Sequence, residues 1–130
     1  MGARRDTKSN GELAEAAFVH KAVSLGLVVS KPFGPDARYD FVVDSGTRLY
    51  RVQVRSVRCD GGSGYLVRCC YSKQRPYTPQ DIDVLAAYVI AENAWYIIPV
   101  GAFAPAVGIG IRPGGRGRFE SYREAWHLLG

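Results

Sequence analysis

The sequence predicts a protein of the α/β (α+β) class, in which helices pack on a central mixed β-sheet. The first observation is the length of 130 residues, which suits one domain with one modest core. The second is the order of the hydrophobic patterns, in which a helical pattern precedes a run of short, alternating strand patterns. No repeat or linker divides the chain, so we expect a single domain over residues 1–130, with residues 1–8 flexible.

The first helix is predicted over residues 9–25. Ser9 and Glu12 have the spacing of a capping box, in which both side chains bind backbone amides at the helix start. Gly26 suits the left-handed conformation that often ends a helix. Four strand patterns follow, and Ser45-Gly46 between the second and third indicates a two-residue turn. These strands are expected at residues 27–30, 39–44, 47–57 and 65–71.

A second helix is predicted over residues 80–90. Thr78 fits its N-cap position, and Pro79 fits its first helical position. Asp81 and Asp83 are then acids in the first turn, where the helix dipole favours them. The predicted topology is approximately αβββαβ with a C-terminal strand and helix. The elements after the second helix are strands at residues 94–100 and 107–112 and a helix at residues 121–129.

The cysteines and the uncharged segments exclude several classes of protein. Cys59, Cys69 and Cys70 have neither metal-ligand spacing nor a disulfide pattern, so we expect a reducing, cytoplasmic environment. Residues 94–111 carry no charge, but prolines and glycines interrupt them, so they are expected to form strands. The N-terminal residues are charged and precede no apolar stretch, which argues against a secretory signal. We therefore expect no membrane partner.

The positive charge of the chain is concentrated in one segment. The sequence has 17 Lys+Arg and 12 Asp+Glu, a net charge of +5 that predicts a polyanionic partner. Residues 47–75 contain seven basic residues, one acid and interleaved tyrosines, which is typical of a track for a nucleic-acid backbone. The alternative is a solvated strand edge whose charges prevent aggregation. The basic residues are Arg48, Arg51, Arg55, Arg58, Arg68, Lys73 and Arg75.

Glu15 is the first candidate for a functional acid. On a helical wheel it falls inside the apolar arc, between Phe18 and Val19. A carboxylate in that position is costly unless it is paired, hydrogen-bonded or bound to a metal. The alternative is a position at the edge of the helix, where Glu15 reaches solvent or pairs with an arginine.

The predicted hairpin contributes further polar residues. With a two-residue turn, Asp40 lies opposite Arg51, and strand alternation places Gln53 and Arg55 on the same face. The opposite face, which includes Val52, is expected to pack into the hydrophobic core. A cross-strand ion pair with Arg51 would by itself explain Asp40. The whole polar row on an interior strand indicates a site instead.

These residues together resemble a known family. Glu15 on a helix, Asp40 in a Tyr-Asp-Phe sequence, and Gln53 and Arg55 in a Gln-Val-Arg sequence are similar to the motif of the PD-(D/E)XK nuclease superfamily. The likeness is to small group I intron homing endonucleases and the Holliday-junction-resolvase-like branch, with Gln-x-Arg in place of (D/E)-x-Lys. The resemblance implies a restriction-endonuclease-like core. It covers residues 7–100, including the segments 48–54, 81–86 and 94–99.

The resemblance implies a metal-dependent bacterial endonuclease that hydrolyses the phosphodiester bonds of DNA. Asp40, Gln53 and Glu15 would hold Mg²⁺ or Mn²⁺ through oxygen atoms, the ligands that these ions prefer. Arg55 would complete the catalytic group. One such site cuts one strand, so we expect a homodimer or higher homo-oligomer on DNA.

Arg55 stands where the family has lysine. A guanidinium is not deprotonated at ordinary pH and cannot act as a base, although it can stabilise charge. The sequence is therefore compatible with a slow nuclease and with a catalytically impaired protein that binds nucleic acid without cutting it. A small interaction domain that binds no nucleic acid is a third interpretation.

Overall fold

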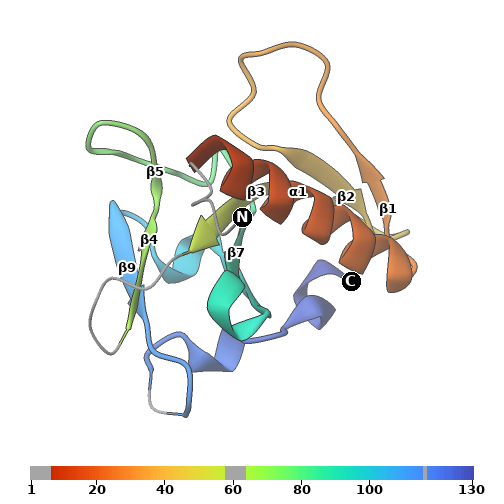
Figure 1. Cartoon of the computed structure of the whole chain (residues 1–130). Coiled ribbons are helices and arrows are strands. Elements are labelled where there is room, and N and C mark those ends of the chain that lie inside the picture. The colour runs from red at the N-terminus through yellow and green to blue at the C-terminus, as the bar shows by residue number, and fades with distance from the viewer. Residues whose placement is uncertain (1–6, 58–63, 116) are drawn as a thin grey trace.

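The centre of the molecule is a five-stranded mixed β-sheet (Figure 1). The structure, a computed structural model, describes residues 7–57, 64–115 and 117–130. The sheet consists of β1 Val28–Ser30, β2 Phe41–Asp44, β3 Leu49–Val57, β7 Val84–Val89 and β8 Ala94–Pro99. Its strand order is β1-β2-β3-β7-β8. The pair β3 and β7 is parallel and the other neighbours are antiparallel, which confirms the predicted mixed sheet.

The described part of the connection between β3 and β7 contains three short strands. A parallel pair needs a long crossover, because the chain must return to the edge where the first strand began. The prediction of one strand over residues 65–71 was wrong, because the segment divides at Cys69 into two strands that pair with different partners. The short strands are β4 Tyr65–Arg68, which pairs with β9 Gly108–Ile111, and β5 Cys70–Ser72, which pairs with β6 Arg75–Pro76.

One helix, α1 (Thr7–Ser24), covers one face of the sheet (Figure 1). Phe18 on this helix stacks on Phe41 of β2 with 5.5 Å between the ring centroids. The helix begins before Ser9, so Ser9 lies within it and the predicted capping box does not form its start. Lys8 is likewise helical and not part of a flexible end. Gly26 has φ +85°, as expected for the residue that ends the helix.

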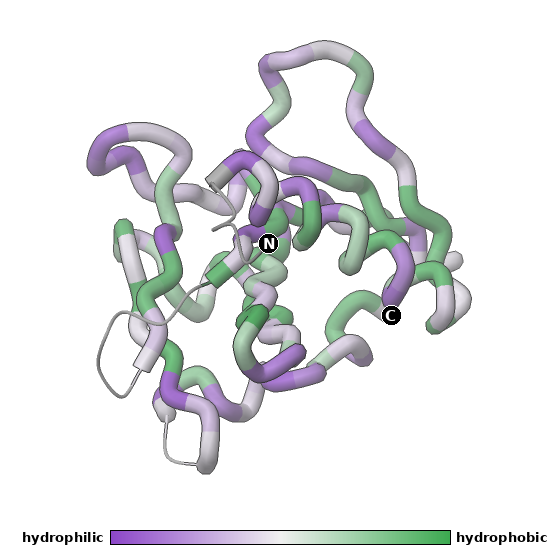
Figure 2. The backbone as a smooth tube through the Cα atoms, viewed as in Figure 1, coloured by the Kyte–Doolittle hydropathy of each residue, from purple (hydrophilic) through white to green (hydrophobic). Residues whose placement is uncertain are grey.

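Buried side chains lie on both faces of the sheet. Those on one face pack against α1 and the C-terminal segment, and those on the other pack against β4, β9 and the turns after β8. Because both faces of β7 and β8 are covered, these strands are almost continuously hydrophobic. Figure 2 shows the hydrophobic residues concentrated in the strands, and the hydrophilic ones in the outer loops.

The prediction of a helix over residues 80–90 was wrong, because most of that segment is the interior strand β7. The residues that suggested a helix start form a turn instead. The backbone N–H and the hydroxyl of Thr78 both donate to Asp81 Oδ2, and the N–H of Gln80 donates to Thr78 Oγ1. A short apolar run fits a buried strand as well as a buried helix, and here the pairing with β3 and β8 decides.

The hairpin between β2 and β3 has a longer loop than expected. Asp44 pairs with Leu49, so the loop has four residues, and Ser45 Oγ accepts the N–H of Arg48. The register is therefore shifted by two residues, and Phe41 pairs with Val52. Because the shift is even, every side chain keeps its predicted face.

The C-terminal helix expected over residues 121–129 is replaced by two short 3₁₀ helices, Glu120–Tyr122 and Trp126–Leu129. The residues between them attach to the edge of β8. The N–H of Glu124 donates to Trp95 O, and the N–H of Trp95 donates to Glu124 Oε2. Glu124 has φ +51°, which a continuous α-helix does not allow.

Candidate active site

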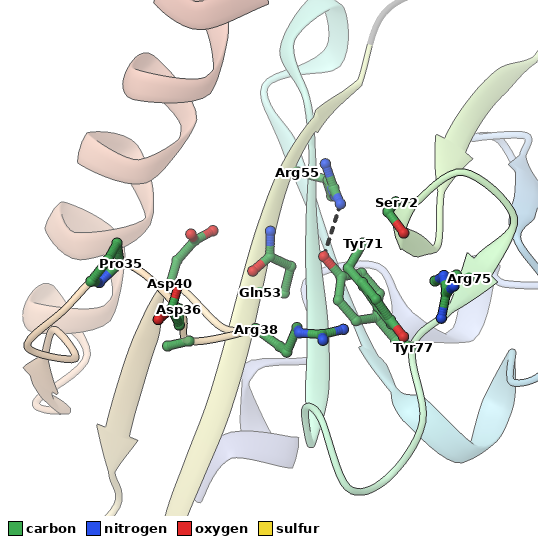
Figure 3. A pocket seen from close by; sticks show the side chains of 11 residues that line it. Pro35, Asp36, Arg38, Asp40, Gln53, Arg55, Tyr71, Ser72, Arg75 and Tyr77 are labelled. Carbon is green, nitrogen blue, oxygen red and sulfur yellow. Dashed lines mark hydrogen bonds between the residues drawn. The ribbon is translucent and has the colours of Figure 1, made fainter.

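An open cleft of about 760 Å³ lies beside the start of β2 and the middle of β3 (Figure 3). Its walls come from three parts of the chain that are distant in sequence: the loop that leads into β2, the strand β3, and the hairpin formed by β5 and β6 with the residue that follows. The lining residues are Pro35, Asp36, Ala37, Arg38, Asp40, Gln53, Arg55, Tyr71, Ser72, Arg75 and Tyr77. Three of the four predicted catalytic residues, Asp40, Gln53 and Arg55, therefore meet in one cleft.

Asp40 lies immediately before β2, with its carboxylate close to β3. Its Oδ2 accepts the backbone N–H of Val54 at 3.0 Å. The observed register places Asp40 beside Gln53 and not opposite Arg51, as the shorter turn had predicted. Burial raises the pKa of Asp40, and the nearby charge of Glu15 raises it further, against the opposing effect of the Val54 hydrogen bond. Asp40 is thus a carboxylate that a cation would stabilise.

Glu15 approaches Asp40 from α1 without lining the cleft. Its side chain is 34% exposed, and its Oε1 lies 3.3 Å from the ammonium of Lys31. Of the two interpretations of Glu15, a residue at the helix edge that forms an ion pair describes it better, although its partner is a lysine and not an arginine. The pair is with a lysine that follows β1, which the helical wheel could not show.

Arg55 extends from β3 toward the wall made by β5 and the residue after β6 (Figure 3). Its Nη2 donates to Cys70 O and to the hydroxyl of Tyr77, both at 2.8 Å. Its Nε is buried and has no hydrogen-bond partner among the described residues. The guanidinium is thereby fixed in place, and its positive charge opposes the rise in the pKa of Asp40.

Two of the predicted nucleic-acid-binding arginines have protein partners away from the cleft. Arg51 donates its Nε and Nη2 to Asp83 at 3.2 Å, and Nη1 and Nη2 also bind the carbonyls of Gln80 and Pro79. Arg48 lies 3.6 Å from the same Asp83. Neither arginine lines the cleft. Asp83 is therefore the acid of an ion-pair network and does not belong to a helix start.

The remaining basic residues are divided between the cleft and other surfaces. Arg75 lines the cleft, whereas Arg68 lines a separate, smaller pocket and Lys73 is exposed in the turn of the β5–β6 hairpin. Arg58 lies outside the described residues. Sequence reasoning missed Arg38, which stands on the loop before β2 and outside the basic segment. Its position two residues before Asp40 is the signal that could have indicated it.

The comparisons with known proteins agree with this geometry. Residues 5–129 match the family model described as PD-(D/E)XK endonuclease. The chain belongs to this family. Its structure is similar to that of a bacterial homing endonuclease, I-Ssp6803I, with a TM-score of 0.83 and 30% identity over 96% of this chain and 93% of that chain. No curated protein matches the sequence. The predicted family and the restriction-endonuclease-like fold are confirmed.

PD-(D/E)XK nucleases generally use divalent metal ions. Within the described part of the chain, no group of three or more His, Cys, Asp or Glu residues could hold a metal. The oxygen donors beside the cleft are two mutually repelling carboxylates, Asp40 and Glu15, and the side-chain carbonyl of Gln53. Hard oxygen donors of this kind suit Mg²⁺ or Mn²⁺. None of the described helices is long and apolar enough to cross a membrane.

Proposed function

We propose that this protein is a metal-dependent endonuclease that hydrolyses phosphodiester bonds in DNA. The observation that carries the proposal is the position of Asp40, which lies near Glu15 and shares a cleft with Gln53, Arg38, Arg55 and Arg75. An acidic group that attracts a cation thus adjoins basic groups that attract a phosphate backbone. Because one site cuts one strand, cleavage of both strands uses two copies of the chain.

Each residue of the site has a distinct role in this proposal. Asp40 and Glu15 supply the negative charge that holds Mg²⁺ or Mn²⁺, and Gln53 supplies a neutral carbonyl oxygen. The bound ion would supply an activated water and neutralise the charge that develops on the phosphate. Arg55 presents a fixed positive charge beside these groups, and it acts by electrostatic stabilisation because it stays protonated.

Nicking of supercoiled plasmid DNA in the presence of Mg²⁺ or Mn²⁺ tests the proposal. We expect cleavage by the wild-type protein and none by Asp40→Asn, which keeps an acceptor for the Val54 N–H but removes the negative charge. Asp36→Asn is the matched control, because Asp36 lines the same cleft and is not a proposed ligand. Absence of wild-type cleavage with both metals, or equal cleavage by Asp40→Asn, would contradict the proposal.

The second candidate is a catalytically impaired relative that binds DNA without cutting it. The engagement of Arg55 Nη2 by Cys70 O and Tyr77 favours it, because these bonds hold the guanidinium against the cleft wall. In that case the wild-type protein binds duplex DNA and does not nick it, and Arg55→Lys creates cleavage by restoring a compact ammonium. If the Arg55→Lys protein also fails to cut DNA, the replacement of lysine by arginine does not explain the lost activity, and this second candidate is contradicted.

A further inference from the structure

We propose that Arg38 and Arg75, held around Tyr71, form a second phosphate site in the cleft. The site binds a backbone phosphate of the DNA strand close to the phosphate that is cleaved beside Asp40. It thereby positions the strand for cleavage. The inference rests on the proposed function for the identity of its ligand, because DNA supplies the phosphate. The site belongs to the part of the cleft farthest from α1.

The two arginines meet at one tyrosine although they come from different parts of the chain. The guanidinium carbon of Arg38 lies 3.5 Å from the centroid of the Tyr71 ring, which is a close stacking contact. Figure 3 shows Arg38 and Arg75 reaching toward the tyrosines from opposite sides of the view. A hydrogen-bonding contact with Arg38 lowers the pKa of the Tyr71 hydroxyl, and Arg75 adds to this effect. Both positive charges therefore lie at the same phenol.

Neither arginine forms an ion pair with a described carboxylate, although the charge of Asp81 acts on Arg38 from a greater distance. Among the described residues, no ion pair within 4.0 Å includes Arg38 or Arg75, whereas Arg48 and Arg51 both pair with Asp83. Asp36 lines the same cleft but lies beyond ion-pair distance of both. An anion that binds at Tyr71 would therefore interact with both positive charges. The planar, multidentate guanidinium suits a phosphate best among biological anions.

The position of this pair relative to Asp40 follows from the chain itself. Arg38 and Asp40 are two residues apart, so their Cα atoms are at most about 7 Å from each other. Both residues line one continuous cleft. A DNA phosphate bound between Arg38 and Arg75 therefore lies near the candidate metal ligands. It can belong to the same DNA strand as the phosphate that would be cleaved. Ser72, which also lines the cleft, adds a hydroxyl that can donate to a phosphate oxygen.

The test measures binding to a 30-base-pair mixed-sequence duplex in Ca²⁺, over a series of KCl concentrations. The double variant Arg38→Ala/Arg75→Ala should bind about 10-fold more weakly, and its salt slope should fall by about 1, the change expected for one lost phosphate contact. Arg118→Ala is the matched control, because Arg118 is an exposed arginine that lies over an aromatic ring, that of Phe119, outside the cleft. Its affinity and slope should stay close to those of the wild type.

Two tyrosine variants distinguish a built site from general positive charge. Tyr71→Phe keeps the stacked ring and should bind nearly as well as the wild type. Tyr71→Ala removes the support of Arg38 while every charge remains, and should weaken binding several-fold. Equal slopes for the double variant and Arg118→Ala, or no effect of Tyr71→Ala, would overturn the inference.

The plasmid assay separates this inference from the proposed function. In Mg²⁺, the double variant should show a raised KM with a smaller change in kcat, because it loses strand positioning and keeps the metal ligands. Loss of binding in the double variant of a protein that never cuts DNA would support the phosphate site and contradict the nuclease. A wild-type protein that cuts plasmid DNA while the double variant binds normally would contradict only the phosphate site.

Discussion

Arg51 and Arg55 lie on the same face of β3, but only Arg51 has a carboxylate partner among the described residues. Arg51 is neutralised by Asp83 and donates to two further carbonyl oxygens. Arg55 donates to a carbonyl and a phenol, and among the described residues no carboxylate oxygen lies within 4.0 Å of it. Arg51 therefore stabilises the fold, whereas the positive charge of Arg55 remains available to a ligand. The cleft lies beside the arginine whose positive charge has no carboxylate partner among the described residues.

The largest effect is expected from removal of the uncompensated charge. Arg55→Ala should lower the rate of plasmid cleavage about 100-fold or more, the usual cost of one group that stabilises developing charge. Arg51→Ala is the internal control, because its activity per folded molecule should stay within a few-fold of the wild type. The comparison fails if the two variants lose cleavage equally when the rates are corrected for folded protein.

The next effect is on stability and concerns the compensated region. Asp83→Ala should lower the free energy of unfolding by about 2 kcal/mol, because it leaves the guanidinium and the backbone N–H of Arg51 without their acceptor. Urea denaturation followed by tryptophan fluorescence measures this change. Asp36→Ala, at an acid that forms no ion pair with any described residue, should change the same quantity by less than about 0.5 kcal/mol. Equal losses in both variants would show that the network contributes nothing specific.

A smaller effect is the pH dependence of stability through Asp83. Burial alone would raise the pKa of Asp83, but the hydrogen bonds from Arg51 outweigh it and lower the pKa below 3.8. The stability that this carboxylate contributes is therefore present above pH 3.8 and is lost as the pH falls through the folded pKa. The Asp83→Asn protein should lose stability less steeply between neutral pH and pH 3. Parallel stability profiles of the two proteins would contradict this account.

The smallest effect concerns Asp40, whose pKa is shifted in the opposite direction. Burial and Glu15 raise this pKa, so the folded state disfavours the charged form, and stability falls as the pH rises from 3.8 through the folded pKa. In EDTA at pH 7, Asp40→Asn should therefore increase the free energy of unfolding by about 1 kcal/mol or less. Added Mg²⁺ should raise the melting temperature of the wild type and not that of the variant. A variant that is less stable in EDTA would contradict this prediction.

Much of the fold could be predicted because the strong local patterns agree with the tertiary structure. The stop of α1 at Gly26, the strand before the Ser45 loop and the buried strand β8 all follow from local chemistry. The order of Glu15, Asp40 and Gln53 along the chain was enough to indicate the family. These features depend on side chains that are close in sequence or alternate regularly.

The parts that could not be predicted depend on contacts between distant segments. The segment of β7 carries a plausible helix start at Thr78, and only its pairing with β3 and β8 makes it a strand. The register at Asp40 depends on two extra loop residues, whose hydrogen bonds to Ser45 no strand pattern reveals. Arg38 was missed because a stack on Tyr71, 33 positions further along the chain, gives it its place in the cleft.

The crossover between β3 and β7 has a consequence for how this protein matures. The cleft takes one wall from the segment before β2 and the other from residues 71–77, which lie inside that crossover. Parallel pairing must join distant parts of the chain, so it forms late and slowly in folding. The hairpin of β2 and β3 holds the first wall, but the wall of residues 71–77 is complete only when the crossover has brought β7 beside β3. A nascent or truncated chain therefore lacks the complete cleft, and any cutting of DNA is confined to the finished molecule.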